Sequence, residues 1–171
     1  MKSNDFVKWL YPAAKRVSDV SPIFVTAKAA LESGWGGSRI GFNLFGITKG
    51  SSWNGPTRLV TTTEYFSNPN KRFFLPEVVV SIEAIGANRY KYTVKRLFRD
   101  YQSLDECLVD YLAILRKPHF ADAWPYRKDP YTYVARLQDE VGLKYATAPN
   151  YVQVMNQLIR KIERIVLEEN L

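Results

Sequence analysis

The stretch AALESGWGGSRIGFNLFGI, residues 29–47, places a lone carboxylate, Glu32, at the end of an apolar helical run. The preceding residues, IFVTAKAAL, are nearly all apolar, which predicts a buried helix. The residues that follow, SGWGG, are rich in glycine and leave room for a ligand to approach the backbone. A surface helix has no need of this arrangement, whereas an active-site cleft does.

Such a setting favours acid catalysis. A carboxyl group beside apolar walls loses hydration, which raises its pKa and lets it act as a general acid near neutral pH. Trp35 and Phe45 are the aromatic residues expected to supply the wall. The alternative is a solvated glutamate on a helix surface, and the sequence does not decide between the two.

The composition predicts one globular domain. Of 171 residues, 46% are hydrophobic and 24% charged, which suffices for a substantial core. No linker, repeat or low-complexity segment divides the sequence, so we expect residues 1–171 to form a single catalytic domain. Aromatic residues make up 14%, and this abundance of Tyr and Trp points to a sugar or another planar-faced ligand.

The charge balance favours anionic partners. A net charge of +7 attracts nucleic acid, anionic lipid or an acidic polymer such as a bacterial cell wall. The basic residues are scattered, and no run resembles a disordered nucleic-acid-binding tail, so nucleic acid is not expected as a partner. The densest basic group consists of Lys91, Lys95, Arg96 and Arg99, with Lys71 and Arg72 upstream.

A single cysteine, Cys107, excludes an intrachain disulfide and fits folding in a reducing compartment. It falls in a predicted helix stripe, where a buried, inert thiol is expected. The N-terminal residues lack the continuous apolar segment of a signal peptide, and no run has the length of a transmembrane helix. We therefore expect synthesis in the cytoplasm, with another component exporting or releasing the protein.

Cap and proline signals place helices at both ends of the chain. An apolar stripe predicts a first helix with Ser3 or Asn4 as its N-cap. The pair Ser21-Pro22 opens a second helix, which should stop at Gly34. Later helices are expected to begin at the capping-box pattern Ser103-Leu104-Asp105-Glu106, at Asp129-Pro130 and after Pro149, with the first two ending near Pro118 and Gly142.

The longest helix is the last one. A basic amphipathic helix of this kind can bind membranes, but docking on the core is the simpler alternative and the one we favour. Its apolar stripe consists of Val152, Met155, Leu158, Ile159, Ile162, Ile165 and Val166.

The middle of the chain predicts strands. Residues 57–66, 78–85 and 88–98 are rich in β-branched residues or alternate in polarity, and turn residues separate them. We expect a small antiparallel β-lobe at about 57–98, inserted between helices, and hence an α+β, mainly α, fold.

A glycosidase usually needs a second acidic group beside its general acid. Strand alternation puts Glu64, in the segment TTTEYF, on the same face as Thr62. Caps and hairpins account more simply for the other candidates, although composition alone does not single out Glu64. Those others are Glu77, Glu83, Asp105 and Glu106.

Competing chemistries have little support. The only histidine, His119, has no nucleophile elbow to serve. No His/Cys pattern suits a transition metal, no Asp-rich loop suits calcium, and GWGGSRIG lacks the Lys-Ser/Thr of a phosphate-binding loop. No cofactor or metal is expected.

Six motifs occur in an order that resembles a known family. Together they are similar to the glucosaminidase domains of glycoside hydrolase family 73, which include flagellar rod-assembly hydrolases, autolysins and phage lysins. The resemblance covers about residues 5 to 165. The motifs are AALESGWG, NLFGI, WNG, TTTEY, FRDYQSLDECLVDYLAIL and YATAPNY.

The resemblance implies a lysozyme-like helical fold with a β-lobe beside a substrate groove. It implies cleavage of the β-1,4 bond after N-acetylglucosamine in peptidoglycan. The family's catalytic acid falls on Glu32, its second carboxylate on Glu64 and its active-site tyrosine on Tyr145. Residues expected to bind substrate are Trp35, Asn43, Phe45, Trp53 and Tyr65, and for Trp35, Phe45 and Trp53 a place in the core near the site is the alternative.

Two departures from the family stand out. Ala148 replaces the aspartate that usually caps the last helix, a loss of about 1 kcal/mol unless Thr147 substitutes. The stretch from about Ser67 to Lys95 is longer than a compact lobe requires, which leaves open where Glu64 lies relative to Glu32.

The course of the reaction also stays open. Glu64 could activate water, with inversion, or the substrate's 2-acetamido oxygen could attack the anomeric carbon while Glu64 and Tyr145 stabilise the developing charge. A carboxylate separation of roughly 6.5–9.5 Å suits a base with water between, and one of roughly 5–5.5 Å suits a direct nucleophile.

Rival functions are a muramidase or lytic transglycosylase that uses Glu32 alone, and a non-catalytic wall-binding or phage structural protein. The motifs after residue 43 and the joint presence of Glu32, Glu64 and Tyr145 argue against both. We expect a monomeric phage or prophage lysin or tail component that acts on peptidoglycan glycan strands of the bacterial cell wall, after release or as part of a phage particle.

Overall fold

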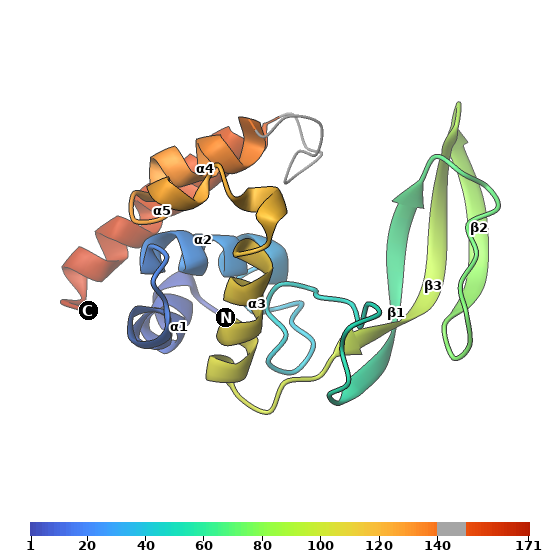
Figure 1. Ribbon diagram of the computed structural model, residues 1–171, viewed down its shortest axis with the longest axis horizontal. Coiled ribbons are helices and arrows are strands. Elements are labelled where there is room, and N and C mark those ends of the chain that lie inside the picture. Colours follow the sequence, from blue (N-terminus) through green and yellow to red (C-terminus); the bar gives the residue numbers. More distant parts are fainter. Residues whose placement is uncertain (140–149) are drawn as a thin grey trace. The chain divides into compact units, whose positions relative to one another are not determined.

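The computed structural model describes residues 1–139 and 150–171. The chain forms two compact units (Figure 1). The helical unit comprises Met1–Phe45 and Tyr101–Leu171, and the β-lobe comprises Gly46–Asp100. The expected α+β fold, with a β-lobe inserted between helices, is therefore confirmed.

In the helical unit, α2 is the central helix. It packs against α1, α4 and α5, while α1 also packs against α3 (Figure 1). The helices are α1 (Ser3–Val17), α2 (Pro22–Ser33), α3 (Leu104–Leu115), α4 (Pro130–Asp139) and α5 (Tyr151–Glu168), with short 3-10 turns η1 (Pro118–Phe120) and η2 (Trp124–Tyr126).

The predicted limits of α2 are confirmed. The Ser21 hydroxyl accepts a hydrogen bond from the Phe24 N–H at 3.4 Å, and Pro22 occupies the first turn. Gly34 ends the helix in the left-handed conformation, with φ 54°. Most of the helix is buried, because the apolar run provides a core-facing side chain at nearly every position.

Other cap predictions had mixed outcomes. Ser103 caps α3 by accepting from the Glu106 N–H at 3.1 Å, and the carboxylate of Asp129 accepts from the Thr132 N–H at 2.7 Å, as expected. The prediction for α1 was wrong: Lys2 occupies the N-cap position and makes no side-chain cap. Three residues of these predictions lie outside the described residues: Gly142, expected to close α4, Ala148, which replaces the family's capping aspartate before α5, and Thr147, its possible substitute.

Helix α5 lies in the core, as the docked alternative predicted. Its buried side chains recur every three or four residues and face α2 and α4. They are Tyr151, Met155, Ile159, Ile162 and Ile165. Across residues 1–139 and 150–171, no helix carries an apolar run long enough to cross a membrane.

The β-lobe holds a three-stranded antiparallel sheet of β1 (Thr57–Phe66), β2 (Val78–Gly86) and β3 (Arg89–Arg99). Strand β3 is central, so the order is β1-β3-β2 (Figure 1). In the register of β1 with β3, Glu64 pairs with Tyr92 and Tyr65 with Lys91. Neighbouring residues of β1 therefore point to opposite faces of the sheet.

One face of this sheet is covered and the other is open. Tyr92 and Val94 are fully buried on the covered face, where the rings of Phe66 and Phe73 pack against Tyr92. The Tyr92 hydroxyl donates to the Asn68 carbonyl at 2.8 Å, which holds the segment after β1 over the sheet. The long insertion expected from the sequence thus builds the small core of the lobe.

Candidate functional site

Glu32 lies in the last turn of α2, and its surroundings differ from those expected. Its side chain is 38% exposed rather than buried. The Lys28 ammonium donates to Glu32 Oε1 at 2.5 Å. The expectation of a desolvated carboxyl group is therefore corrected: the buried member of this pair is the lysine.

Lys28 is a residue that the sequence reasoning missed. Its side chain is 8% exposed, and its ammonium lies 5.0 Å from the centre of the Tyr151 ring of α5. Burial lowers the pKa of Lys28, while the charge and hydrogen bond of Glu32 act in the opposite direction. A lysine inside the apolar run IFVTAKAAL, one turn before the candidate acid, was the available signal.

Backbone geometry explains the glycines in the turn that follows Glu32. Gly36 has φ 78°, and a Cβ at this position would lie 3.3 Å from the Phe6 ring. The Ser33 hydroxyl accepts from the Gly36 N–H at 2.8 Å and fixes the turn. Trp35 itself adopts φ 57°, a strained conformation for a residue with a side chain. The turn thus presents Trp35 at the same end of α2 as Glu32.

Trp35 is partly exposed and packed on one side. Its ring meets Phe6 edge to face at 5.7 Å, and the Lys161 ammonium lies 4.6 Å from its centre. These contacts orient the indole while leaving part of it accessible, as a substrate-binding residue requires.

Asn43 and Phe45, also expected near the substrate, lie inside the helical unit. Asn43 is 1% exposed and Phe45 is 8% exposed. The Phe45 ring stacks on Tyr111 at 3.8 Å with an angle of 10° between the planes. Phe45 thus packs in the core, one of the two roles that the sequence left open for it, and the expected substrate contact of Asn43 stays a prediction for a side chain that is almost fully buried here.

In the β-lobe, Glu64 belongs to an ion cluster on the covered face. Arg96 Nη1 lies 2.6 Å and 2.8 Å from the two carboxylate oxygens of Glu64. Arg96 Nε lies 3.5 Å from Glu77, whose carboxylate also accepts from the Leu97 N–H at 2.9 Å. Glu64 and Glu77 therefore share one arginine, and Glu77 is a second residue whose role the sequence did not reveal.

Tyr65 lies on the open face of the sheet, opposite Glu64. Its ring is 56% exposed, and the Arg89 guanidinium lies 5.5 Å from its centre. Glu64 and Tyr65, the two neighbouring candidate site residues of β1, thus point to opposite faces of the sheet. An accessible tyrosine ring offers a platform for a sugar on the open face.

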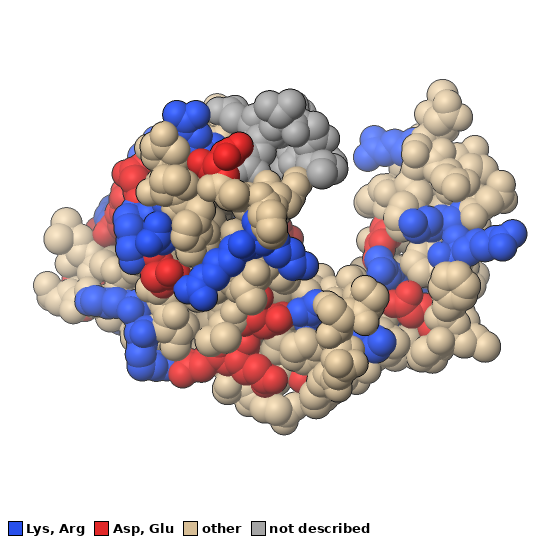
Figure 2. All heavy atoms as spheres, in the orientation of Figure 1, with Lys and Arg blue, Asp and Glu red and all other residues tan. Residues whose placement is uncertain are grey.

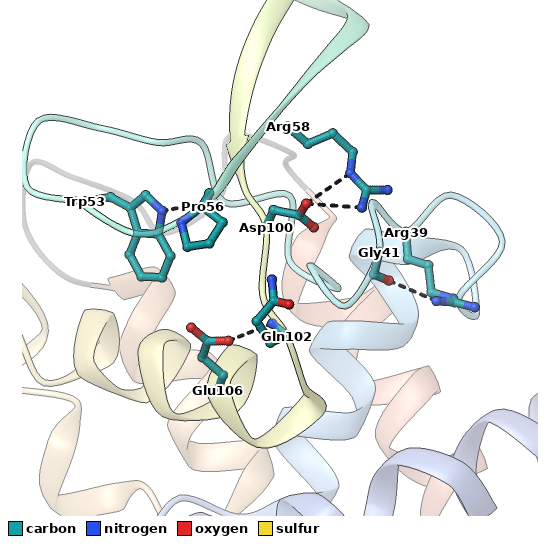
Figure 3. A network of polar contacts seen from close by, with 8 residues as sticks. All are labelled: Arg39, Gly41, Trp53, Pro56, Arg58, Asp100, Gln102 and Glu106. Atoms are coloured by element: carbon teal, nitrogen blue, oxygen red, sulfur yellow. Dashed lines mark hydrogen bonds and ion pairs between the residues drawn. The ribbon is translucent and has the colours of Figure 1, made fainter.

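Trp53 is held in the loop before β1. Its indole N–H donates to the Pro56 carbonyl at 2.9 Å (Figure 3), and the Arg99 guanidinium lies 4.9 Å from its ring. A Cβ at Gly55 would lie 2.5 Å from the indole, so only glycine fits beside it. Close by within the lobe, Arg58 binds Asp100 at 3.1 Å (Figure 3).

Charge is distributed unevenly between the units. The β-lobe holds nine Lys and Arg against four Asp and Glu, so it carries +5 of the net +7. On the helical unit, basic and acidic side chains are interspersed over the visible face (Figure 2). An anionic polymer is therefore attracted mainly to the lobe.

The described residues give little support for metal or thiol chemistry. Among residues 1–139 and 150–171, no three His, Cys, Asp or Glu side chains are grouped to hold a metal ion. Cys107 is fully buried, and burial raises the pKa of its thiol to about 12, so it stays protonated and inert. Tyr145, the third catalytic candidate, lies outside the described residues.

The arrangement gives each unit one candidate carboxylate with a cationic partner. The helical unit combines Glu32, Lys28 and a partly exposed Trp35, and the β-lobe combines Glu64, Arg96 and Glu77. An accessible carboxyl group can donate a proton, and a second one can activate water or stabilise positive charge.

Comparison with known proteins gives a consistent result. A family model described as glucosaminidase, mannosyl-glycoprotein endo-beta-N-acetylglucosaminidase, matches residues 8–164. The peptidoglycan hydrolase FlgJ of Salmonella typhimurium is 32% identical over 175 residues, covering 94% of this chain and 46% of that protein. A probable N-acetylmuramidase of Lactococcus lactis is 29% identical over 168 residues, covering 90% of this chain and 32% of that protein.

This chain therefore spans less than half the length of these two relatives. Among solved structures, the glycoside hydrolase domain of Salmonella typhimurium FlgJ superimposes with a TM-score of 0.73 and 28% identity. The match covers 99% of this chain and 94% of that domain. The predicted family resemblance and lysozyme-like fold class are confirmed by these matches.

Proposed function

Because this chain belongs to the glucosaminidase family of glycoside hydrolases, we propose that it cleaves the β-1,4 bond after N-acetylglucosamine in peptidoglycan, with Glu32 as general acid. The observation that carries the proposal is the carboxyl group of Glu32. It is accessible, it lies three residues before the partly exposed Trp35 in the sequence, and the Lys28 ammonium donates to its Oε1 at 2.5 Å.

In the proposed reaction, Glu32 donates its proton to the glycosidic oxygen as the bond from that oxygen to the anomeric carbon breaks. The bond electrons go to the leaving oxygen, and positive charge develops on the sugar ring. In one route a water molecule then attacks the anomeric carbon and Glu64 takes its proton. In the other, the substrate's 2-acetamido oxygen attacks the anomeric carbon and forms a cyclic oxazolinium ion, which water opens while the Glu32 carboxylate takes the proton of that water. Tyr145 is proposed to stabilise the developing charge.

The environment of Glu64 bears on this choice. Both oxygens of the Glu64 carboxylate accept from Arg96 Nη1, at 2.6 Å and 2.8 Å, so each is already engaged by a cation. The carboxylate remains well suited to stabilise positive charge on the sugar. This supports the route through the acetamido oxygen.

A second candidate function is cleavage of the other glycosidic bond, after N-acetylmuramic acid. Similarity to a probable N-acetylmuramidase favours this alternative. The same general acid would serve either bond, so the contacts that the protein makes with the two sugars determine which bond is cleaved. The role as a phage lysin or tail component stays a prediction from the sequence.

The test is the release of sugar reducing ends from purified, peptide-intact peptidoglycan. We expect the protein to release them and Glu32→Gln to release almost none. Glu106→Gln is the matched control, because Glu106 is also in the helical unit, at the start of α3, where its carboxylate accepts from the Gln102 N–H at 2.6 Å (Figure 3).

Equal activity of the protein and of Glu32→Gln would overturn the assignment of the acid. Release of amino groups without reducing ends would identify cleavage of the peptide stems and overturn the proposed bond class. Binding of the wall without cleavage would favour the non-catalytic alternative.

A further inference from the structure

Lys28 is unusual as a buried lysine, because such residues are seldom fully buried without a charged partner. It lies on the α2 surface that packs against α5, with 8% of its side chain exposed and the Tyr151 ring 5.0 Å away. Among the described residues, the charged group that faces it is Glu32, whose Oε1 is 2.5 Å away. The chain thus keeps a costly group inside its core, next to the candidate acid.

Helix stability does not explain the pair. In an isolated helix, a glutamate four residues before a lysine stabilises more than the reverse order found here. A carboxylate in the last turn is also placed against the negative end of the helix dipole. The order of the two charges and the helix dipole both disfavour this pair, so helix stability does not account for it. We therefore look for its role in the effect of Lys28 on Glu32.

We propose that Lys28 is a positioning residue that holds the Glu32 carboxyl group for proton transfer. The Lys28 ammonium donates a hydrogen bond to Glu32 Oε1, and no residue in the described part of the chain donates to Oε2. The proton to be transferred therefore resides on Oε2, directed away from Lys28. This inference rests on the proposed function, since it takes Glu32 to be the general acid.

The pair also acts after the transfer. When Glu32 gives its proton to the leaving oxygen, it becomes a carboxylate, and the Lys28 ammonium stabilises that charge at 2.5 Å. The proton and the bond electrons both end on the leaving sugar oxygen, so Lys28 neither gains nor loses a proton. Because Lys28 is buried, its contact is with Glu32 rather than with substrate.

Two substitutions separate orientation from charge. Lys28→Met keeps a long, flexible side chain of similar reach but removes both the donor and the charge, and Lys28→Gln keeps a donor without the charge. The matched control is Lys8→Gln, which removes a lysine from an exposed ion pair with Glu169 at 2.6 Å. Thermal unfolding of each variant identifies those that fold.

We expect Lys28→Met to lower kcat on solubilised peptidoglycan about tenfold or more, with KM changed less than about twofold, because loss of acid positioning costs part of the 10²–10⁴-fold acid contribution. Lys28→Gln should recover part of kcat. Lys8→Gln should match the unmodified protein in every respect.

The double variant makes the dependence on Glu32 explicit. If Lys28 acts through Glu32, adding Lys28→Met to Glu32→Gln should change the residual rate less than about twofold. Folded Lys28→Met and Lys28→Gln proteins with unchanged kcat and KM would overturn the inference and leave a purely structural lysine. Failure of the proposed function is distinct, because Glu32→Gln would then be as active as the unmodified protein.

Discussion

In the helical unit, Glu32 is held by a lysine four residues earlier on the same helix, whereas in the β-lobe Glu64 is held by an arginine 32 residues away on a neighbouring strand. The first contact follows from the periodicity of one helix. The second exists only once β1 and β3 have paired in the correct register. The two candidate carboxylates thus depend on different levels of structure.

The units differ in packing as well. The helical unit buries most of α2 and a stripe of α5, while every residue of β2 is exposed. Apolar side chains such as Phe74 and Leu75 are more than 80% exposed on the lobe. The lobe therefore has the smaller stabilising core and the larger share of the positive charge, and the helical unit supplies the rigid platform.

The largest expected effect separates the two carboxylates. Glu32→Gln should lower kcat by about 10²–10⁴-fold, because the acid has no substitute when the leaving oxygen needs a proton. Glu64→Gln should lower it by about 10–100-fold, since the acetamido oxygen of the substrate can still attack. Steady-state rates on the same peptidoglycan preparation measure both. The reverse order would contradict the division of roles.

The next effect compares the two cores. Phe45→Ala removes a ring stacked on Tyr111 and should cost the helical unit about 3–5 kcal/mol in free energy of unfolding. Phe73→Ala, at a partly exposed site in the lobe, should cost about half as much. Hydrogen exchange resolved by segment reads each unit separately. Equal losses would show that the lobe is packed as well as the helical unit.

Removing Arg96 tests the sheet contact. Arg96→Met leaves Glu64 and Glu77 facing each other without their shared cation, and we expect a loss of about 1–2 kcal/mol in the protection of β1 and β3, because these side chains are partly solvated. Arg58→Met is the control, since its pair with Asp100 is more exposed. Indistinguishable exchange in the two variants would show that the cluster does not order the lobe.

The smallest effect concerns pH. Burial raises the pKa of Cys107 from 9.0 to about 12, so above pH 9 the unfolded chain loses a proton that the folded chain keeps. Stability from this group is full below pH 9 and declines above it, by about 1 kcal/mol at pH 10. Denaturant unfolding of the unmodified protein and of Cys107→Ala should diverge accordingly. Parallel pH dependence would mean that the thiol is accessible.

Much of the fold follows from local sequence signals. Ser21-Pro22 and Gly34 set the limits of α2, and the β-branched segments give three strands close to their observed limits. Such signals act within a few residues, so they are readable without a structure. The cap of α1 was mispredicted because a serine can begin a helix without its side chain accepting a hydrogen bond.

The site was less accessible to sequence reasoning. Burial of Lys28, Asn43 and Phe45 depends on which helices pack together, and periodicity in one segment does not reveal it. The sharing of Arg96 by Glu64 and Glu77 requires the strand register and the path of the insertion. By contrast, strand alternation alone predicts that Glu64 and Tyr65 point to opposite faces of the sheet, so this feature could be read from the sequence.

The most direct test of the central claim is the identity of the new reducing sugar. Peptidoglycan is digested with the protein and with Glu32→Gln, reduced with borohydride and analysed by mass spectrometry. We predict fragments that end in reduced N-acetylglucosamine with the protein and almost none with Glu32→Gln. Fragments ending in reduced or anhydro muramic acid would contradict the proposed bond and establish the muramidase or transglycosylase alternative.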